Sequence, residues 1–89
     1  MVLGKVIGTV VATQKDPSLV GKKLLLVKAI DLNDNILEPF VVAVDAVGVG
    51  VGEKVLVVNG SSARMTDETK DRSIDSVIVA KVDSIQVSI

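Results

Sequence analysis

The chain has 89 residues, of which 48% are hydrophobic, and a formal net charge of −1. This length indicates a single domain, residues 1–89, with a modest core, and the charge gives no electrostatic reason to bind nucleic acid. The absence of Cys and His excludes disulfides, Ser-His and Cys-His nucleophiles and most zinc sites. We therefore expect no catalysis, no cofactor and no bound metal.

The N-terminal residues and the apolar runs do not indicate export or membrane insertion. Residues 1–5 lack a basic region followed by a long apolar core, which a signal peptide needs. The longest apolar runs are far too short to cross a bilayer. The expected location is the cytoplasm, with neither a membrane nor a nucleic acid as partner.

The apolar residues are mainly Val, Ile, Leu and Ala, and Phe40 is the only aromatic residue. This composition favours strands. In chain order, turn signals separate five predicted strands, which indicates an all-β fold, a small five-stranded OB-like antiparallel β-barrel with at most a short helical turn. The predicted strands cover residues 2–13, 23–30, 40–46, 55–58 and 77–82.

The first predicted strand contains two glycines. Because side chains alternate along a strand, Gly4 and Gly8 are expected on one face with Val6 and Val10. Such paired glycines let a strand coil as a small barrel requires.

A loop is predicted over residues 14–21, where Asp-Pro-Ser gives turn chemistry. Lys15, Lys22 and Lys23 flank its two ends. We interpret the two later lysines as a solvated start of the second strand. A surface facing a lumen or cargo is the alternative for all three.

The turn after the second strand resembles the start of a calcium-binding loop. Asp31, Asn33 and Asn35 give D-x-N-x-N. The sixth position is Ile36 rather than Gly, and the twelfth is Val42 rather than Glu. We therefore predict a hairpin turn that uses Asn and Asp in left-handed conformations.

Three glycines between the third and fourth strands recur at every second position: Gly48, Gly50 and Gly52. They are expected along one edge of an extended segment, where another backbone or a neighbouring subunit comes close. A phosphate-binding loop is rejected, because the dinucleotide fingerprint needs G-x-G-x-x-G opening a helix. Here the spacing is G-x-G-x-G and a β-type run follows.

A small polar segment follows the fourth strand. Asn59-Gly60 predicts a tight turn. Ser61 and Ser62 beside Arg64 suggest an anion site or a nucleophile, but nothing supplies a general base, and such serines more often bond local backbone.

The stretch before the fifth strand is charged. Residues 65–72 are expected to form a solvent-exposed loop. Asp71 or Ser73 is the candidate cap of a short helical turn around residues 74–76. Asp45, Asp75 and Asp83 end or flank strands, where carboxylates normally face solvent or pair with Lys or Arg.

Several strands are apolar at consecutive rather than alternate positions. A small barrel has one interior, so strands that are apolar on both faces need cover from outside. Uncovered apolar patches of that size would aggregate, so the sequence predicts an oligomer. Residues 83–89 are expected to lie along a neighbouring subunit. The runs are residues 24–27, 40–44, 55–58 and 77–80.

Taken together, these segments resemble the EutN/CcmL/PduN family, the pentameric vertex proteins of bacterial microcompartments. Members often have Ala where Val49 stands and Gly where Ala80 stands. The matching segments span nearly the whole chain: residues 8–15, 19–27, 43–53, 55–57, 60–64, 74–75 and 78–83.

The resemblance implies a structural shell protein of a bacterial microcompartment, located in the shell within the cytoplasm. Homopentamers would cap the vertices among hexagonal shell proteins, because hexagons alone tile a plane and cannot enclose a volume. A hexamer is possible in isolation. The alternative is an OB-like module that binds nucleic acid or a protein ligand outside a shell, although one aromatic residue and an acidic balance disfavour nucleic acid.

Eight residues are candidates for a subunit interface or the edge of an axial pore. The glycines would allow tight packing, and Arg64 would make a charge-assisted bond to Asp45 or Glu53, either within one subunit or across subunits. The full set is Asp45, Gly48, Gly50, Gly52, Glu53, Ser61, Ser62 and Arg64.

Overall fold

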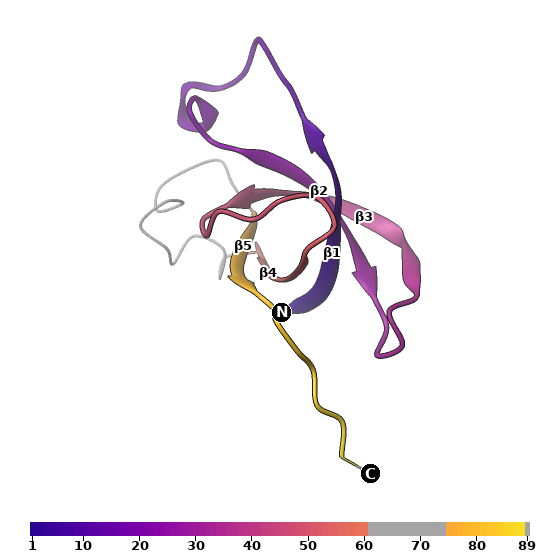
Figure 1. Cartoon of the computed structure of the whole chain (residues 1–89). Helices are drawn as coiled ribbons and strands as arrows, with labels where there is room; N and C mark the ends of the chain where they lie inside the picture. The colour runs from indigo at the N-terminus through magenta and orange to yellow at the C-terminus, as the bar shows by residue number, and fades with distance from the viewer. Residues whose placement is uncertain (61–74, 89) are drawn as a thin grey trace.

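The computed structural model describes residues 1–60 and 75–88, and these form a closed barrel with strand order β1-β2-β3-β5-β4 (Figure 1). This confirms the predicted five-stranded all-β barrel. Within the described residues the only helical element is a 3₁₀ turn. The elements are β1 Val2–Val10, the 3₁₀ turn η1 Pro17–Leu19, β2 Leu24–Ile30, β3 Ile36–Asp45, β4 Lys54–Asn59 and β5 Ser76–Lys81.

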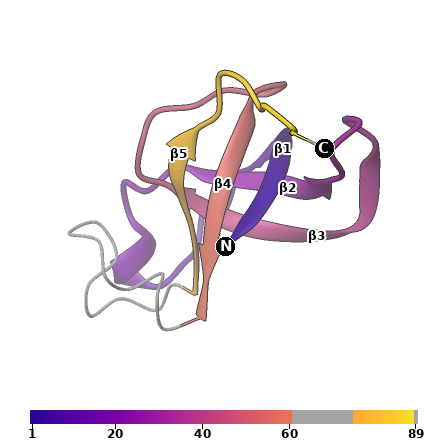
Figure 2. The ribbon, with the colours of Figure 1, turned by 90° about the horizontal axis from the view of Figure 1, so that it is seen from below.

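One strand pairing differs from the antiparallel expectation. β3 and β5 run parallel, with Val44 beside Val77 and Asp45 beside Ile78, whereas the other four pairings are antiparallel. Figure 2 shows β4 between β5 and β1, so the barrel closes through strands that are far apart in sequence. Local patterns set the strands, but their direction at the closure depends on the path of the whole chain.

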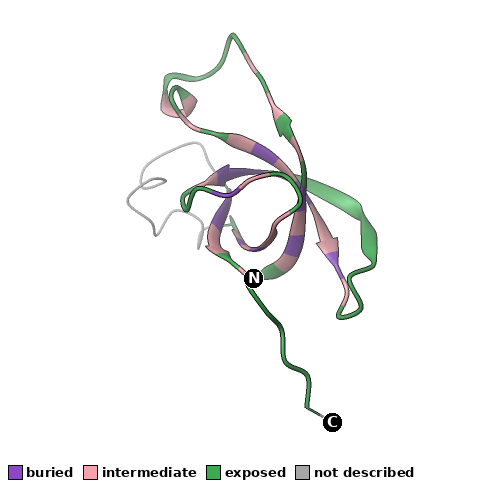
Figure 3. Cartoon of the chain, in the orientation of Figure 1, coloured by how far each residue is buried: buried purple, intermediate pink, exposed green. Residues whose placement is uncertain are grey.

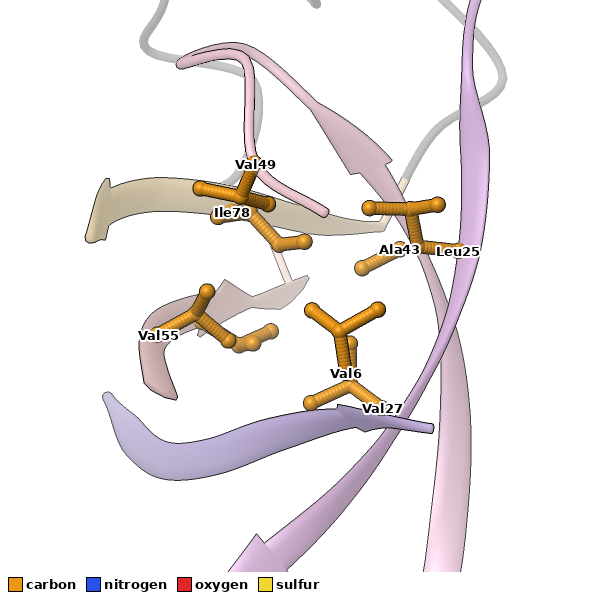
Figure 4. Packing of buried hydrophobic residues seen from close by; sticks show 8 residues of the cluster. Val6, Leu25, Val27, Ala43, Val49, Val55 and Ile78 are labelled. Atoms are coloured by element: carbon orange, nitrogen blue, oxygen red, sulfur yellow. The ribbon is translucent and has the colours of Figure 1, made fainter. Parts of the chain in front are cut away.

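Branched aliphatic side chains fill the barrel interior (Figure 4). Val6 and Val27 lie directly opposite each other in the β1–β2 ladder, and both are buried. These side chains fill the middle of the barrel, so contact surfaces are expected at its ends, its rim or its outside. The cluster comprises Val6, Leu25, Val27, Ala43, Val49, Val55, Val57 and Ile78.

Two strand boundaries differ clearly from the prediction. β1 ends at Val10 rather than residue 13, and β3 begins at Ile36 rather than residue 40. β3 runs through Pro39 because its pairing with β2 shifts register between Lys28 and Ile30. A proline, which has no N–H to donate, fits such an irregular or edge position.

The two glycines of β1 do not share a face. A bulge between Val6 and Gly8 shifts the register, so Val6 pairs with Val27 but Gly8 pairs with Leu26. One extra residue in a strand reverses the alternation after it, and Gly8 therefore lies on the face opposite Gly4.

The turn between β2 and β3 is the predicted hairpin turn. One Asp31 carboxylate oxygen accepts hydrogen bonds from the N–H groups of Asn33 and Asn35, at 2.8 and 2.9 Å. The left-handed residue is Asp34, with φ of 66°. Its carboxylate also pairs with Lys54 Nζ at 2.8 Å, which ties the hairpin tip to the start of β4.

The prediction of a short helical turn around residues 74–76 is wrong at Ser76, which is the first residue of β5. Its hydroxyl donates to Asn59 Oδ1 at 2.8 Å, which joins β5 to the end of β4. Gly60 has the positive φ, 66°, expected of a turn residue. The loop at residues 65–72 and the candidate caps Asp71 and Ser73 lie outside the described residues.

Candidate functional site

The glycine loop, residues 46–53, connects β3 to β4 and folds over one end of the barrel. Val49 is 1% exposed and belongs to the core cluster, whereas its neighbours Val47 and Val51 are 47% and 61% exposed. Figure 4 shows Val49 among the core side chains. The loop therefore plugs the barrel with one valine and presents two others at the surface.

The glycines of this loop do not form an extended edge, as the alternation predicted. Gly48 and Gly52 have φ of 97° and 93°, left-handed values that favour glycine, while Gly50 does not. A Cβ at Gly48 or Gly52 would meet nothing within 4 Å in this chain, and one at Gly50 would lie 3.6 Å from Glu53 Oε1. Within the chain, the spacing reflects turn geometry rather than close packing.

The close approach occurs at Gly4 instead. A Cβ there would lie 2.6 Å from Val27 Cγ1 and 2.9 Å from the carbonyl oxygen of Lys28. Only glycine fits such a contact between β1 and β2 without displacing the backbone.

Asp45, the last residue of β3, holds the glycine loop in place. Its side chain is 1% exposed. Oδ1 accepts from the N–H groups of Val47 and Gly48 at 2.9 and 2.8 Å, and Oδ2 accepts from the N–H of Val49 at 2.8 Å. A carboxylate with several backbone donors is a strong local anchor.

The protonation of Asp45 follows from these contacts. Burial raises the pKa of the carboxyl, but the N–H donors of Gly48, Val47 and Val49, together with the charge of Lys23, lower it further than burial raises it. The net pKa lies below its ordinary value of 3.8. The anion is therefore the form that the fold stabilises.

Lys23, the residue before β2, supports the same loop. Its Nζ donates to the carbonyl oxygen of Val49 at 2.6 Å and lies 3.7 Å from Asp45 Oδ2. The side chain is 52% exposed, so the prediction of a solvated lysine holds for part of the side chain only. The ammonium group has a specific structural contact that the sequence did not indicate.

Glu53 anchors the other end of the loop. Oε1 accepts from the N–H of Gly50 at 2.7 Å, and Oε2 pairs with Lys81 Nζ at 2.7 Å. Lys81 and then the Gly50 N–H lower the pKa of Glu53, and Glu53 in turn raises the pKa of Lys81. Backbone bonds from Gly52 N to Val6 O and from Val6 N to Glu53 O, at 2.8 and 3.0 Å, attach this end to β1.

Three of the candidate interface residues, Ser61, Ser62 and Arg64, lie outside the described residues. The proposed bond from Arg64 to Asp45 or Glu53 therefore stays a prediction. Both carboxylates already have partners within the chain.

The second prominent surface is the first part of β3, residues 36–42, which we call the β3 arm. It extends from the barrel with the hairpin, and Figure 3 shows it exposed. Sequence reasoning identified its apolar run only from Phe40 on, because Glu38 and Pro39 interrupt the pattern. Its exposed apolar residues are Ile36, Leu37, Phe40, Val41 and Val42.

An apolar hollow lies between the β3 arm and the end of β4. Val41 forms part of its wall, and Val27 and Val57 from the barrel core form the floor. The hollow holds no charged side chain among its lining residues, which suits an apolar occupant rather than an ionic one. Those residues are Val2, Val27, Ala29, Pro39, Val41, Val57 and Asn59.

Comparison with known proteins gives a consistent answer. A family model described as "Ethanolamine utilisation protein EutN/carboxysome" matches residues 1–83. The chain belongs to this family. The carboxysome shell vertex protein CcmL of Nostoc sp. is 48% identical over 88 residues, which cover 98% of this chain and 87% of that protein. The microcompartment shell vertex protein PduN of Salmonella typhimurium is 46% identical over 89 residues, covering 96% and 98%.

Solved structures agree with this family membership. The Nostoc CcmL structure has a TM-score of 0.94 at 48% identity, covering 98% of this chain and 92% of that one. GrpN from Rhodospirillum rubrum, described as a pentameric microcompartment shell protein, has a TM-score of 0.90 at 44% identity, covering 99% and 100%. No helix in the described part of this EutN/CcmL family member is long and apolar enough to cross a membrane.

Proposed function

We propose that this chain is a structural shell protein of a bacterial microcompartment whose homopentamers cap the vertices and close the polyhedral shell. The observation that carries the proposal is the β3 arm, whose exposed apolar residues need cover, in a chain 44% identical to a pentameric shell protein. The relatives' names, shell vertex proteins of several compartments, support this function over that of a separate OB-like binding module.

The proposed mechanism is geometric rather than catalytic. A fivefold ring needs one heterologous contact, in which two different surfaces of each copy meet and the ring closes. Each contact should bury on the order of 1,000 Å² or more to be stable. The β3 arm supplies one such surface. The proposed neighbours of the ring are hexagonal shell proteins, and the proposed location is the shell within the cytoplasm.

The glycine loop is the proposed pore edge or second contact region. Val47 and Val51 are presented at its surface, while Asp45 and Glu53 fix the loop backbone from within the chain. A Cβ at Gly48 or Gly52 would meet no atom of this chain within 4 Å, and a Cβ at Gly50 would meet only Glu53 Oε1, at 3.6 Å. Ser61, Ser62 and Arg64 complete the proposed set. This support is compatible with a rigid rim around a fivefold axis.

Native mass spectrometry of the purified chain at low micromolar concentration tests the proposal. A dominant fivefold species supports it, and electron microscopy of shells assembled with and without the chain then tests closure directly. A monomer would overturn it, because the apolar β3 arm would then have no partner. A sixfold species would leave the family membership intact and put either the isolated assembly or the vertex geometry in question.

A further inference from the structure

The described C-terminal segment, residues 83–88, leaves the barrel and makes no hydrogen bond to the rest of the described chain. Val82 is the last anchored residue, donating from its N–H to the Lys54 carbonyl at 2.8 Å. Beyond it, Figure 1 shows an extended segment with no element beside it, and Figure 3 shows it exposed. We call residues 83–88 the tail.

The tail has the sequence pattern of a half-buried strand. Ile85 and Val87 alternate with Ser84, Gln86 and Ser88, and alternation of this kind predicts one apolar face. Ile85 and Val87 are 37% and 56% exposed. The tail is therefore a strand by pattern that has no strand partner among the described residues and leaves part of its apolar face exposed, Val87 more than Ile85.

The β3 arm lacks a strand partner along one of its two edges, within the described residues. Its residues pair with β2 on one side, but β5 pairs with β3 only at Val44 and Asp45. Over residues 36–43 the other edge of β3 has no strand partner among residues 1–60 and 75–88. An apolar edge that is free on one side is a template for an added strand.

The apolar hollow lies beside this free edge. Pro39 and Val41 of the β3 arm line it together with residues of β1, β2 and β4. Because alternate side chains of an added strand point to one face, a strand seated on the edge would place two apolar side chains, two positions apart, over the hollow. Ile85 and Val87 have that spacing.

We propose that the tail of one copy adds as an extra strand to the free edge of the β3 arm of the next copy, with Ile85 and Val87 seated in the apolar hollow. Each copy then donates one tail and receives one, which is the heterologous contact that a closed ring requires. Pro39 has no N–H to offer, so the added ladder is confined to the β3 residues from Phe40 onward. The inference rests on the proposed function, since it needs a ring of copies.

The first test is a variant that ends at Val82, compared with the full chain by native mass spectrometry and circular dichroism. We expect the barrel spectrum to persist and the ring to dissociate at concentrations where the full chain is assembled. A truncated chain that forms the same ring with the same stability would overturn the inference and leave the proposed function intact. A monomeric full chain would overturn the proposed function itself.

A second test separates the two faces of the tail. The double variant Ile85→Ser, Val87→Ser removes the apolar face, whereas the control Ser84→Ala, Ser88→Ala alters the polar face without adding bulk. The first is expected to raise the concentration of half-dissociation by at least about tenfold, as loss of a central apolar contact does. The control should leave it unchanged; equal effects of the two variants would contradict the proposal.

The natural absence of cysteine allows a direct geometric test. Val41→Cys combined with Ile85→Cys or with Val87→Cys should form disulfides between copies on mild oxidation, because facing residues on paired strands come within reach of a disulfide. A ladder of covalent oligomers up to the closed ring on a non-reducing gel is expected for at least one of these pairs. The matched control, Val41→Cys with Gln86→Cys, should give little cross-linking.

Two outcomes of the cysteine experiment would overturn the inference. A disulfide within one chain would show that the tail returns to its own β3 arm. A ring that remains assembled while neither pair cross-links more than the Gln86→Cys control would show that the tail lies elsewhere.

Discussion

The glycine loop and the β3 arm are both rich in valine, but the chain treats them in opposite ways. The loop buries Val49 in the core and is held by Asp45, Lys23 and Glu53. The β3 arm leaves Phe40, Val41 and Val42 exposed and has a free backbone edge. The loop thus fixes its own backbone within the chain and leaves only Val47 and Val51 exposed, whereas the β3 arm leaves both its apolar side chains and one backbone edge without a partner among the described residues.

This contrast changes the emphasis of the sequence interpretation. From the sequence, the regular glycine spacing predicts a subunit contact at the loop. The structure accounts for that spacing at two positions by positive φ, at Gly48 and Gly52, without any neighbour. The unsatisfied apolar surface lies on β3, where the sequence pattern is interrupted by Glu38 and Pro39.

The largest effect is expected for Phe40→Glu on the β3 arm. Phe40 is 59% exposed and lies opposite Lys28, so the monomer tolerates a carboxylate there, but an apolar subunit contact does not. We expect a loss of about 2–4 kcal/mol per contact, typical of an interface hot spot, and therefore monomers in sedimentation equilibrium. Phe40→Leu is the matched control and should retain the ring. A ring that survives Phe40→Glu would mean that the β3 arm faces solvent.

A smaller effect, on folding, is expected for Val49→Ala in the glycine loop. Val49 is 1% exposed and Val51 is 61% exposed, so the same substitution at the two positions compares a buried with an exposed valine. Removing the buried methyl groups should lower the free energy of unfolding by about 2 kcal/mol, measured by urea denaturation. Val51→Ala should change it little. Equal losses would indicate that Val49 does not plug the barrel.

Asp45→Asn tests the anchor of the glycine loop. The amide keeps the size of the side chain but loses the charge that accepts three backbone N–H groups, so we expect a loss of about 1.5 kcal/mol at neutral pH. Glu38→Gln, on an exposed part of β3, is the control and should cost little. An Asp45→Asn variant as stable as the parent would contradict the anchoring role.

The pH dependence provides a separate check on Asp45. Because its folded pKa is lowered from 3.8, the stability it contributes is fully present above that value and is lost as the pH falls through the folded pKa. The parent protein should therefore lose more folding stability between about pH 6 and pH 2 than Asp45→Asn does. This pH window lies on both sides of the ordinary Asp pKa of about 4. Parallel stability curves for the two proteins would contradict the lowered pKa.

At the loop glycines the cost depends on the backbone angle φ, and the smallest effect is expected at Gly50. Gly48→Ala forces alanine to φ of 97° and should cost about 1–2 kcal/mol of folding stability. Gly50 has ordinary backbone geometry, and the Cβ of Gly50→Ala would lie 3.6 Å from Glu53 Oε1. This substitution should therefore change the free energy of unfolding by only about a few tenths of a kcal/mol. Gly50→Val then tests whether a neighbouring subunit packs closely against the loop. Weakened assembly with an intact barrel would support this close packing, and an unchanged ring would contradict it.

Much of the fold could be predicted from local pattern. The runs of Val, Ile and Leu place five strands correctly, and Asp31 with its following asparagines indicates the hairpin turn that forms. The bulge after Val6 was invisible, because nothing in the sequence marks the register shift that moves Gly8 to the other face. The continuation of β3 through Pro39 was equally hidden, since it depends on an irregular ladder with β2.

The candidate site could be predicted only in part. Asp45 and Glu53 were predicted as interface residues and as partners of Arg64, but the partners that they have within the chain, Lys23 before β2 and Lys81 in β5, lie far from them in sequence. Those pairings depend on which strands become neighbours, and no spacing within the sequence encodes them.

The composition and short segments of the sequence are enough to predict the strand-rich fold, the positions of the turns, the lack of Cys and His chemistry and the excess of apolar residues over what one small barrel can bury. These follow from properties of single residues and short segments, which act wherever the chain lies. The tertiary structure decided the parallel closure of β3 on β5, the burial of Val49 but not Val51, and the free edge of the β3 arm. Each of these depends on contacts between residues distant in sequence, because the barrel brings them together only when it closes.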